Sequence, residues 1–510
     1  MKRILALCLT VCLLCALFAG CATKEAPYTP TGNALDSNTL ATTPPDKEEQ
    51  ELTLIYYPDR SLNPYTATDY TNRVLISLLY QGLFSVDRDY RVEPVLCQSY
   101  RVSPDMKTYT FYLNKAWFAD GTAVTAQDVV KSLSAARYGT YYAGRFQHIE
   151  SVYASEDAVV IELDTPFENL PLLLDIPIVK ASEVTAEVPL GTGPYLWEEL
   201  AAGVRLRRQA AWWCKVPCVA TAPTIALKEA ESINQIRDSF EFGNLDLVCA
   251  DPGADIYADF RCDYEIWDCD TGIFLYLVCH TDSWLFHDDS LRQALTHAMN
   301  RSALVEEFYR GFATAATLPA DPDAPGYNQA LANRYRYDSE AFAAAIANAE
   351  VPEDETAVLA VNANDTLRVR VARRIAEDLG QYGLKVRVEE VPSDEFVEYL
   401  EEGKFDLYLG QTKLSPNMDL SAFFAEEGAL SYGGLTDAAL YAMNQEALAN
   451  SGNRYNLHEQ IMEEGNLIPL LFRSYAIYAT RGVVTDLTPA RDHIFYYSTG
   501  RSLADALITE

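Results

Sequence analysis

The chain has 510 residues, of which 49% are hydrophobic, 22% charged and 11% aromatic, and its formal net charge is -33. This length exceeds what a single hydrophobic core usually serves, so two or three cores are expected. So negative a chain repels nucleic acid and anionic lipid headgroups, which excludes both as expected binding partners.

The amino-terminal fifty residues predict a secreted protein that is tethered to a membrane. Two basic residues precede an apolar run ending at Phe18, which has the length typical of a signal peptide. The small residues before Cys21 make this stretch similar to a lipobox, which implies lipid attachment to the Cys21 thiol; the alternative is a plain secretory signal. We expect residues 1–20 to be a signal peptide and residues 21–50 to be a lipid-anchored, disordered linker.

The body opens with strand patterns and a short helix. Residues 52–56 alternate as a strand does, and Asp69 or Thr71 can cap the helix that follows. Further strands are predicted at residues 109–113 and 159–163, and the arms of a hairpin at residues 195–200 and 204–208.

Residues 117–133, WFADGTAVTAQDVVKSL, are the most informative stretch of the chain. Asp120-Gly121 is a turn pair, because glycine takes positive φ at little steric cost. Thr125 is predicted to cap a helix, with Asp128 three residues later as an acidic variant of the capping box. Apolar residues at helical spacing follow, so the stretch predicts a turn and a capped helix without a catalytic group.

The second half of the body alternates helices and strands. A helix is predicted at residues 232–241, and strands are predicted at residues 245–249 and 274–279. Residues 357–410 predict a β-α-β-α-β series, with the second helix opened by Ser393 and stopped by Gly403. That order implies a mostly parallel sheet with right-handed crossovers.

Three of these stretches resemble motifs of the family 5 extracellular solute-binding proteins, the peptide- and nickel-binding components of ABC importers. The string F-x-D-G-x-x-x-T-A-x-D-V at residues 118–129 is similar to a family signature, GTGPY at residues 191–195 to a second marker, and LYQGLF at residues 79–84 to the opening segment. Residues 291–295 and 301–305 resemble the paired helices of the family, and residues 468–472 and 475–479 resemble its return strands toward the first lobe. The resemblance covers about residues 51–500. It implies an α/β, two-lobed periplasmic-binding-protein-like (type II) fold with an extra subdomain in the first lobe.

The resemblance also implies how the chain is divided. Lobe I with its extra subdomain would take residues 51–272, lobe II residues 273–476, and the return to lobe I residues 477–510. The chain would cross between the lobes near residues 270–275 and 475–480. A monomer that closes around its ligand and then docks to a permease is expected.

The implied function is that of a lipid-anchored substrate-binding protein at the extracytoplasmic face of the cell membrane. It would capture a small solute, an oligopeptide or a similar molecule, and deliver it to an ABC transporter permease, with no reaction catalysed and no cofactor. Alternatives are a peptide-signal or metal-complex receptor on the same fold, and a cell-envelope hydrolase. The chain has no HExxH, P-loop, GxGxxG or nucleophile-elbow motif, which argues against the hydrolase.

The cysteines after Cys21 do not predict a metal site. They are Cys97, Cys214, Cys218, Cys249, Cys262, Cys269 and Cys279. Their odd number leaves at least one without a partner in the chain, and their spacing fits no zinc motif. Buried free thiols are therefore expected, and no pairing is assigned.

Candidate ligand-binding residues follow from the rule that ligand groups gather at strand ends and in the loops after them. The rule singles out Tyr65, Thr66, Tyr276, Trp284, Gln411, Lys413, Ser415, Asn417 and Asp419. For any single aromatic among them, core packing is the alternative role.

The loop after the strand at residues 405–410 departs from the pattern of oligopeptide-binding relatives, which resembles G-W-x-A-D-Y. In those relatives the acidic residue pairs with the free amino group of the peptide. Ser415 stands at that position here, and a neutral hydroxyl cannot replace a charge-assisted bond to an ammonium group. Either Asp419 takes that role or the ligand is not an ordinary peptide, in which case Lys413 can meet a carboxylate or phosphate.

Overall fold

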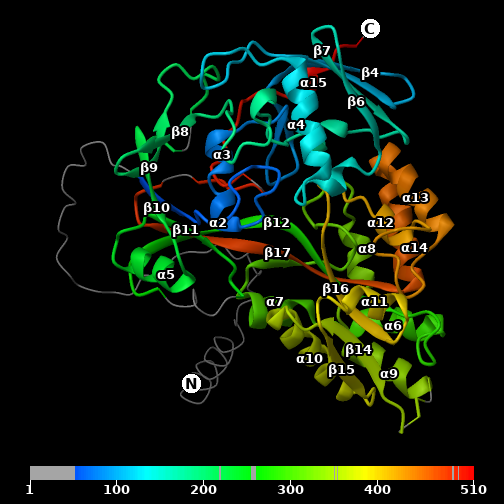
Figure 1. Cartoon of the computed structure of the whole chain (residues 1–510). Coiled ribbons are helices and arrows are strands. Elements are labelled where there is room, and N and C mark those ends of the chain that lie inside the picture. The colour runs from blue at the N-terminus through cyan, green and yellow to red at the C-terminus, as the bar shows by residue number, and fades with distance from the viewer. Residues whose placement is uncertain are drawn as a thin grey trace, which may run out of the picture. The chain divides into compact units, whose positions relative to one another are not determined.

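The structure is a computed structural model that describes residues 52–217, 220–253, 260–349, 351–352, 354–484, 487–491 and 493–509. All of these belong to one of the two units of the chain, Thr43–Glu510. The predicted signal peptide, Cys21, the linker and Cys218 lie outside the described residues. Figure 1 labels the helices and strands and colours them along the chain.

Two long antiparallel strands organise the fold. β12 (Tyr264–Cys279) and β17 (Leu467–Thr480) pair along most of their length and run through the middle of the described structure (Figure 1). They belong to a seven-stranded sheet in the order β11-β17-β12-β16-β14-β15, with β13 beside β17. The two strands predicted at 468–472 and 475–479 are one strand, because the polar residues between them keep the ladder with β12 instead of forming a turn.

The first lobe is the part built on three smaller sheets and on β11. One sheet has the order β1-β10-β9-β8, a second pairs β2 with β3, and a third has the order β4-β5-β7-β6. The strands are β1 (Leu52–Tyr56), β2 (Phe84–Val86), β3 (Val92–Pro94), β4 (Cys97–Val102), β5 (Thr108–Leu113), β6 (Ile149–Ser155), β7 (Ala158–Leu163), β8 (Tyr195–Leu200), β9 (Gly203–Arg208), β10 (Thr224–Glu229) and β11 (Leu247–Ala250). The predicted early strands and the hairpin of β8 and β9 are thereby confirmed.

Short helices complete the first lobe. They are α2 (Tyr70–Arg73), α3 (Ile76–Leu79), α4 (Ala126–Tyr138), α5 (Ile233–Glu241) and α15 (Leu503–Ala506), with 3-10 turns η1 (Ala143–Phe146), η2 (Leu170–Leu173) and η3 (Ala181–Glu183). Asp69, not Thr71, caps α2, because its carboxylate accepts the backbone N–H groups of Thr71 and Asn72. The predicted helix is split into α2 and α3 at Val74 and Leu75.

The predicted capping box at the start of α4 is confirmed. The Asp128 carboxylate accepts the Thr125 backbone N–H at 2.8 Å and the Thr125 hydroxyl at 2.6 Å, while Thr125 Oγ1 accepts the Asp128 N–H. The other Asp128 oxygen accepts the backbone N–H of Ala181 at 2.8 Å. Since Asp128 is buried and fully engaged, the family signature here is structural.

The other two family motifs pack against each other through their backbones. The Gly193 N–H donates to the Leu79 carbonyl at 2.9 Å, and the Ala119 N–H donates to the Gly191 carbonyl at 3.3 Å. A Cβ added at Gly191 would lie 2.2 Å from the Leu79 carbonyl oxygen, and one added at Gly193 would lie 2.4 Å from its carbon. Only glycine permits this approach, so the GTGPY and LYQGLF motifs are explained by packing.

The second lobe is the part built on β14, β15 and β16. β14 is parallel to both neighbours, which confirms the predicted β-α-β-α-β series. The strands are β13 (Ala313–Ala315), β14 (Ala357–Asn362), β15 (Val386–Val391) and β16 (Leu407–Lys413). The helices after β12 are α6 (Asp289–Ala298), α7 (Arg301–Tyr309), α8 (Gln329–Arg334), α9 (Ser339–Asn348), α10 (Thr366–Gly380), α11 (Phe396–Glu401), α12 (Ser421–Phe424), α13 (Ala438–Ala449) and α14 (Arg454–Glu464), with the turn η5 (Ser451–Asn453).

One predicted cap in this lobe is wrong. Ser393 does not open α11 as the sequence predicts, because Glu395 holds the N-cap position, where it makes no side-chain cap bond. Ser393 Oγ instead accepts the Asn362 side-chain amide at 3.1 Å, because the loop after β15 lies beside the loop after β14. Gly403 has a positive φ of 65°, as its predicted role at the end of this helix requires.

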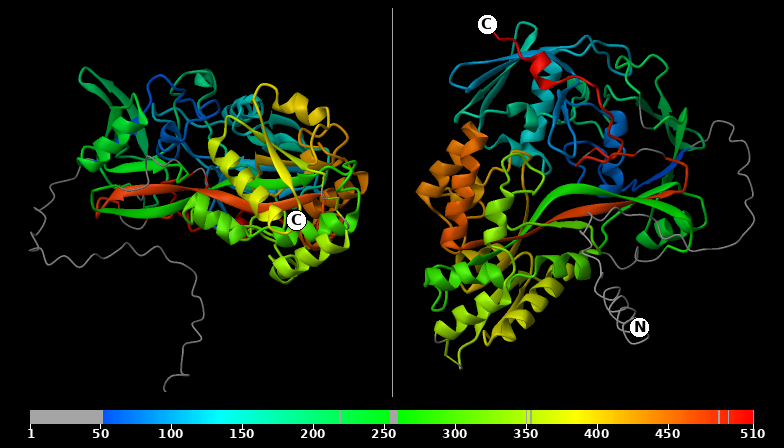
Figure 2. Two further views of the ribbon diagram at one scale, coloured as in Figure 1. Left: turned by 90° about the horizontal axis from the view of Figure 1, so that it is seen from below. Right: turned by 180° about the vertical axis from the view of Figure 1, so that it is seen from behind.

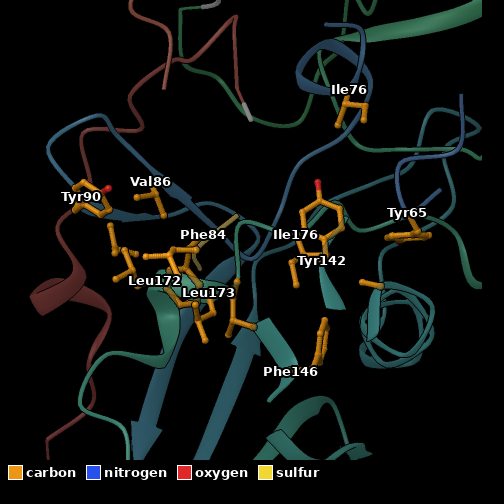
Figure 3. Close-up of a cluster of buried hydrophobic side chains, with 14 of the residues drawn as sticks. Tyr65, Ile76, Phe84, Val86, Tyr90, Tyr142, Phe146, Leu172, Leu173 and Ile176 are labelled. Carbon is orange, nitrogen blue, oxygen red and sulfur yellow. The ribbon is translucent and has the colours of Figure 1, made fainter. Parts of the chain in front are cut away.

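The described residues form more than one hydrophobic cluster, as the length of the chain predicts, but one of these clusters takes side chains from both lobes, such as Phe84 of β2 and Phe423 of α12. Figure 3 shows part of the cluster in the first lobe, where Tyr65, Phe84, Tyr142 and Leu172 are buried together. A second cluster joins apolar side chains of β14, β16 and α10 to one face of the crossing strands. After β17 the chain lies against the first lobe (Figure 2), where the Ile508 N–H donates to the Tyr100 carbonyl at 2.9 Å.

Candidate ligand-binding cleft

An open cleft of about 440 Å³ lies beside β17 at the carboxyl end of β14. Its walls come from Asp251 and Gly253 after β11, from Arg473 in β17, and from residues between 362 and 368, with Ser393. Ligands collect at the carboxyl ends of strands in α/β sheets, and β14 and β16, being parallel, present those ends at one edge. The volume suits a small molecule.

Arg473 is the most deeply buried charge in the cleft, with 8% of its side chain exposed. Its Nη1 donates to Gln411 Oε1 at 3.0 Å and its Nη2 donates to Asp251 Oδ2 at 2.6 Å. Burial by itself lowers the pKa of Arg473, but the charge and hydrogen bond of Asp251, together with Tyr309 and Tyr475, raise that pKa above its ordinary value. Arg473 is therefore charged, and it connects β17 with β16 and with the end of β11.

Arg368 is the second cation that lines the cleft. Asp365 caps α10 by accepting the Arg368 backbone N–H at 2.9 Å, and its other oxygen accepts the Arg368 Nε–H at 3.1 Å. An aspartate that follows a strand and precedes a helix favours this geometry, because its short side chain satisfies the first free N–H groups. The guanidinium of Arg368 is thereby fixed at the start of α10.

Two asparagines brace the loops that form the floor of the cleft. The Asn362 side chain accepts the backbone N–H of Asn364 at 3.0 Å and donates to Ser393 Oγ at 3.1 Å. Asn364 Oδ1 in turn accepts the backbone N–H of Ser393 at 3.3 Å. The loops after β14 and β15 are thus held together by neutral groups.

A second cationic cluster lies further along β16. Lys413 Nζ lies 3.8 Å from the centroid of the Tyr141 ring, and the guanidinium carbon of Arg73 lies 3.1 Å from the same centroid. Lys413 follows Gln411 by two residues, so both side chains project from one face of β16. Lys413 therefore joins the face that carries Gln411 to the first lobe.

Four of the residues predicted from strand ends do not line the cleft. Tyr65 is buried in the first lobe and its hydroxyl donates to a backbone carbonyl at 2.9 Å. Tyr276 is buried in a cluster of aromatic rings. Thr66 is exposed, and Trp284 is 39% exposed in the turn between β12 and α6.

Asp419 is close to the lobe boundary, but its carboxylate is engaged. Its Oδ2 lies 3.2 Å from His148 Nε2, and its Oδ1 accepts the Ser421 hydroxyl at 2.7 Å and the Asn444 amide at 2.8 Å. Only 6% of the Asp419 side chain is exposed. The carboxylate is therefore occupied by protein groups.

Ser415 and Asn417 lie in the same loop outside the cleft. The Ser415 carbonyl accepts the Met418 N–H at 2.9 Å. The Asn417 carbonyl accepts from Arg454 Nη2 at 2.9 Å, while the buried Asn417 Oδ1 has no hydrogen-bond partner among the described residues. None of the predicted residues is among those that line the cleft, but Gln411 is connected to it because its Oε1 accepts from Arg473 Nη1 at 3.0 Å.

Arg368 was missed because the strand-end rule was applied to the loop after residues 405–410 and not to the loop after residues 357–361. Residues 362–368 follow a strand in the same way as residues 411–419, so the same rule could have found Arg368. Arg473 carries a different signal. A charge inside the apolar run of β17 requires a buried partner, which marks it for attention.

Other kinds of site were also sought in the described part of the chain. No group of three or more His, Cys, Asp or Glu side chains there is placed to hold a metal ion. Among the cysteines described, Cys97, Cys214, Cys249, Cys262 and Cys279 are free thiols, and the Cys269 thiol donates to the Arg491 carbonyl at 3.1 Å. No helix among the described residues has the length and apolar character to span a membrane.

Two lobes joined by crossing strands, with a cleft beside one of those strands, are the architecture of the periplasmic-binding α/β proteins, and this fold is of type II. Solved structures share this fold. The substrate-binding protein CtaP of Listeria monocytogenes aligns with a TM-score of 0.72 at 17% identity over 91% of this chain and 100% of that chain. A putative peptide-binding protein, AppA of Clostridium difficile, aligns with a TM-score of 0.72 at 16% identity over 88% of this chain and 98% of that one.

The sequence itself places the chain in a family. The sequence model of the bacterial extracellular solute-binding proteins, family 5 Middle, matches residues 91–427. The glutathione-binding protein GsiB of Shigella flexneri serotype 5b is 26% identical over 347 residues, which are 64% of this chain and 67% of that protein. The chain belongs to the bacterial extracellular solute-binding proteins of family 5 and is a solute-binding protein of the ABC-transporter type.

Proposed function

We propose that the protein captures a small solute in the cleft beside β17 and delivers it to the permease of an ABC importer. The observation that carries this proposal is the origin of the cleft walls. Asp251 comes from the first lobe, Arg473 from a crossing strand and Arg368 from the second lobe. A solute held there contacts both lobes and the strand between them, so its binding energy can favour lobe closure.

We further propose that the protein works as a lipid-anchored monomer at the extracytoplasmic face of the cell membrane and catalyses no reaction. The lipobox-like stretch before Cys21 supports the anchor. The extracellular solute-binding family to which the chain belongs supports the location. Capture and release require no chemical step in the protein, because the ligand leaves unchanged.

The ligand is proposed not to present its amino group to the loop after β16. Ser415 is neutral, and the Asp419 carboxylate is already bound by His148, Ser421 and Asn444. An ammonium group at Asp419 would have to displace these partners in a buried place. Short peptides, glutathione (the ligand named for GsiB) and metal chelates are therefore solutes to compare, with recognition placed in the cleft beside Arg473.

A combined screen tests the function. Di- to hexapeptides, their N-acetylated forms, glutathione, sugars and metal chelates are added to the purified protein, and its melting temperature and X-ray scattering are measured. A captured solute should raise the melting temperature by mass action and reduce the radius of gyration. A solute that is hydrolysed in the same mixture would favour the hydrolase instead. An unchanged scattering envelope at saturating ligand would contradict capture by closure.

The same screen tests the role of the loop after β16. Peptides that bind should keep their affinity after N-acetylation and in an Asp419→Asn variant that remains folded. If free peptides bind, lose affinity on N-acetylation and lose it again in Ser415→Ala, the amino group is read at Ser415 and this part of the proposal fails.

A further inference from the structure

We propose that the cleft recognises an anionic group of its ligand, a carboxylate or a phosphate, between Arg368 and Arg473. This inference rests on the proposed function, because it assigns the chemistry of a ligand held in the same cleft. Both arginines line the cleft, one from α10 in the second lobe and one from β17. An anion that bridges them would bind the second lobe to a crossing strand.

The two guanidinium groups are positioned before any ligand arrives. Arg473 is 8% exposed and held by Gln411 and Asp251, and Arg368 is 13% exposed and held by Asp365. A planar guanidinium matches a carboxylate or phosphate through two parallel hydrogen bonds, and a fixed one loses little side-chain entropy on binding. These are the features of a prepared anion site on the open face of the cleft.

Asp251 occupies the place that the ligand anion would take on Arg473. Its side chain is 34% exposed, and it belongs to the segment after β11, across the cleft from α10. Without Asp251 or a substitute, Arg473 would be a buried charge without a counter-charge, which is costly. When one carboxylate replaces another, the charge stays compensated, so Asp251 can release Arg473 to an anionic ligand.

The charges near the strand ends favour an anion over an ammonium group. Asp251 and Asp365 already bind Arg473 and Arg368, so a ligand ammonium group would have to take a carboxylate away from an arginine, whereas a ligand anion can bind the arginines directly.

Calorimetric titration of the full-length protein tests the ligand group. The probes are trialanine, trialanine amide, N-acetyl-trialanine, succinate and inorganic phosphate. Loss of at least about tenfold in affinity on C-terminal amidation, with little change on N-acetylation, supports a carboxylate, as does binding of succinate. Binding of phosphate without succinate assigns the same site to a phosphate group. Trialanine amide binding as tightly as trialanine, or no binding of any anionic probe, overturns the proposal.

Variants locate the site. Arg368→Gln and Arg473→Gln should each weaken the anionic probes by about tenfold or more, because each removes a charge-assisted contact. Arg373→Gln is the matched control on the same helix, since Arg373 is exposed and pairs with Glu390 outside the cleft lining. Equal affinity in the wild type and both cleft variants would overturn the assignment.

Asp251→Asn gives an independent test that does not depend on the folding of the Arg473 variant. It removes the competing carboxylate and should tighten anion binding, whereas a ligand ammonium read by Asp251 would bind more weakly. Weaker binding of the anionic probes in this variant contradicts the inference. If only neutral or cationic solutes compact the protein, capture stands and the anion site fails. If no solute compacts it, the proposed function fails as well.

Discussion

His148 and Asp419 join the first lobe to the segment that follows β16. The imidazole Nε2 of His148 lies 3.2 Å from Asp419 Oδ2, and both side chains are buried, at 11% and 6% exposed. His148 precedes β6, and its Nδ1 lies 3.1 Å from Asp164. A contact between distant parts of the fold thus depends on a group that titrates near neutral pH.

The contribution of this contact to the stability of the folded protein should fall as the pH rises. Burial by itself lowers the pKa of His148, but the hydrogen bond and charge of Asp419, with Asp164, outweigh burial and raise it above its ordinary value. A raised folded-state pKa stabilises the protein fully below the unfolded pKa, about 6.5, and this stabilisation is lost as the pH rises through the folded pKa. The nearby Tyr441 and Arg454 also face Asp419.

Melting temperatures measured from about pH 6 to about pH 8 check this expectation. The wild type should lose more stability over that interval than His148→Gln, while His287→Gln, which changes an exposed histidine, should follow the wild type. For Asp419, burial raises the pKa, but His148 and Ser421 lower it by more, so the pKa lies below its ordinary value. The stabilisation that the Asp419 carboxylate contributes is therefore lost only in acid. Equal slopes in the wild type and His148→Gln would refute the prediction.

Gly272 should be intolerant of a side chain. It lies in the irregularity of β12 with φ of +69°, and an added Cβ would lie 3.0 Å from Arg491 Nη1 and 3.1 Å from the Leu414 carbonyl oxygen. Gly272→Ala should therefore cost more than the about 1–2 kcal/mol of a left-handed alanine. Gly482→Ala is the control, because its φ is +74° with nothing near the added Cβ. Urea unfolding measures the free energy of unfolding of both variants. Equal losses of that free energy would contradict the prediction, because they would show that the neighbours of Gly272 can move away from the added methyl group.

The cap of α4 should be worth about 1 kcal/mol. Thr125→Ala removes the hydroxyl that accepts the Asp128 N–H and donates to the Asp128 carboxylate. Hydrogen exchange in the first turn of α4 should become faster, whereas Gln127→Ala, on the exposed side of that turn, should leave it near the wild-type rate. Unchanged exchange in Thr125→Ala would mean that packing alone holds this end of the helix.

Cys21→Ser should abolish lipid modification, because the thiol is the proposed acceptor. Membrane fractionation should then find the variant in the soluble fraction and the wild type with the membranes. Mass spectrometry of the mature amino terminus provides the second measurement. A wild-type amino terminus that begins at Cys21 without lipid, or that begins elsewhere, would contradict the proposed anchor.

Local rules predicted most of the regular elements. The cap of α4 by Thr125, the hairpin of β8 and β9, and the parallel series of β14, β15 and β16 each depend on residues close together in sequence. Periodicity, caps and turn residues act over a few positions, so one sequence is enough to read them. The family motifs could be found in the sequence for the same reason, because each is a short stretch whose residues determine a local backbone conformation.

The tertiary structure alone decided which side chains meet. Arg473 and Asp251 are 222 positions apart, and Asp419 is bound by His148 from the turn before β6, so no local pattern predicts either pair. The strand-end rule pointed to loops that follow strands, but packing determined that Tyr65 and Tyr276 are buried while Arg368 lines the cleft. Partners brought together by folding are chosen by the whole core, because burial and charge compensation are satisfied only once distant segments are in place.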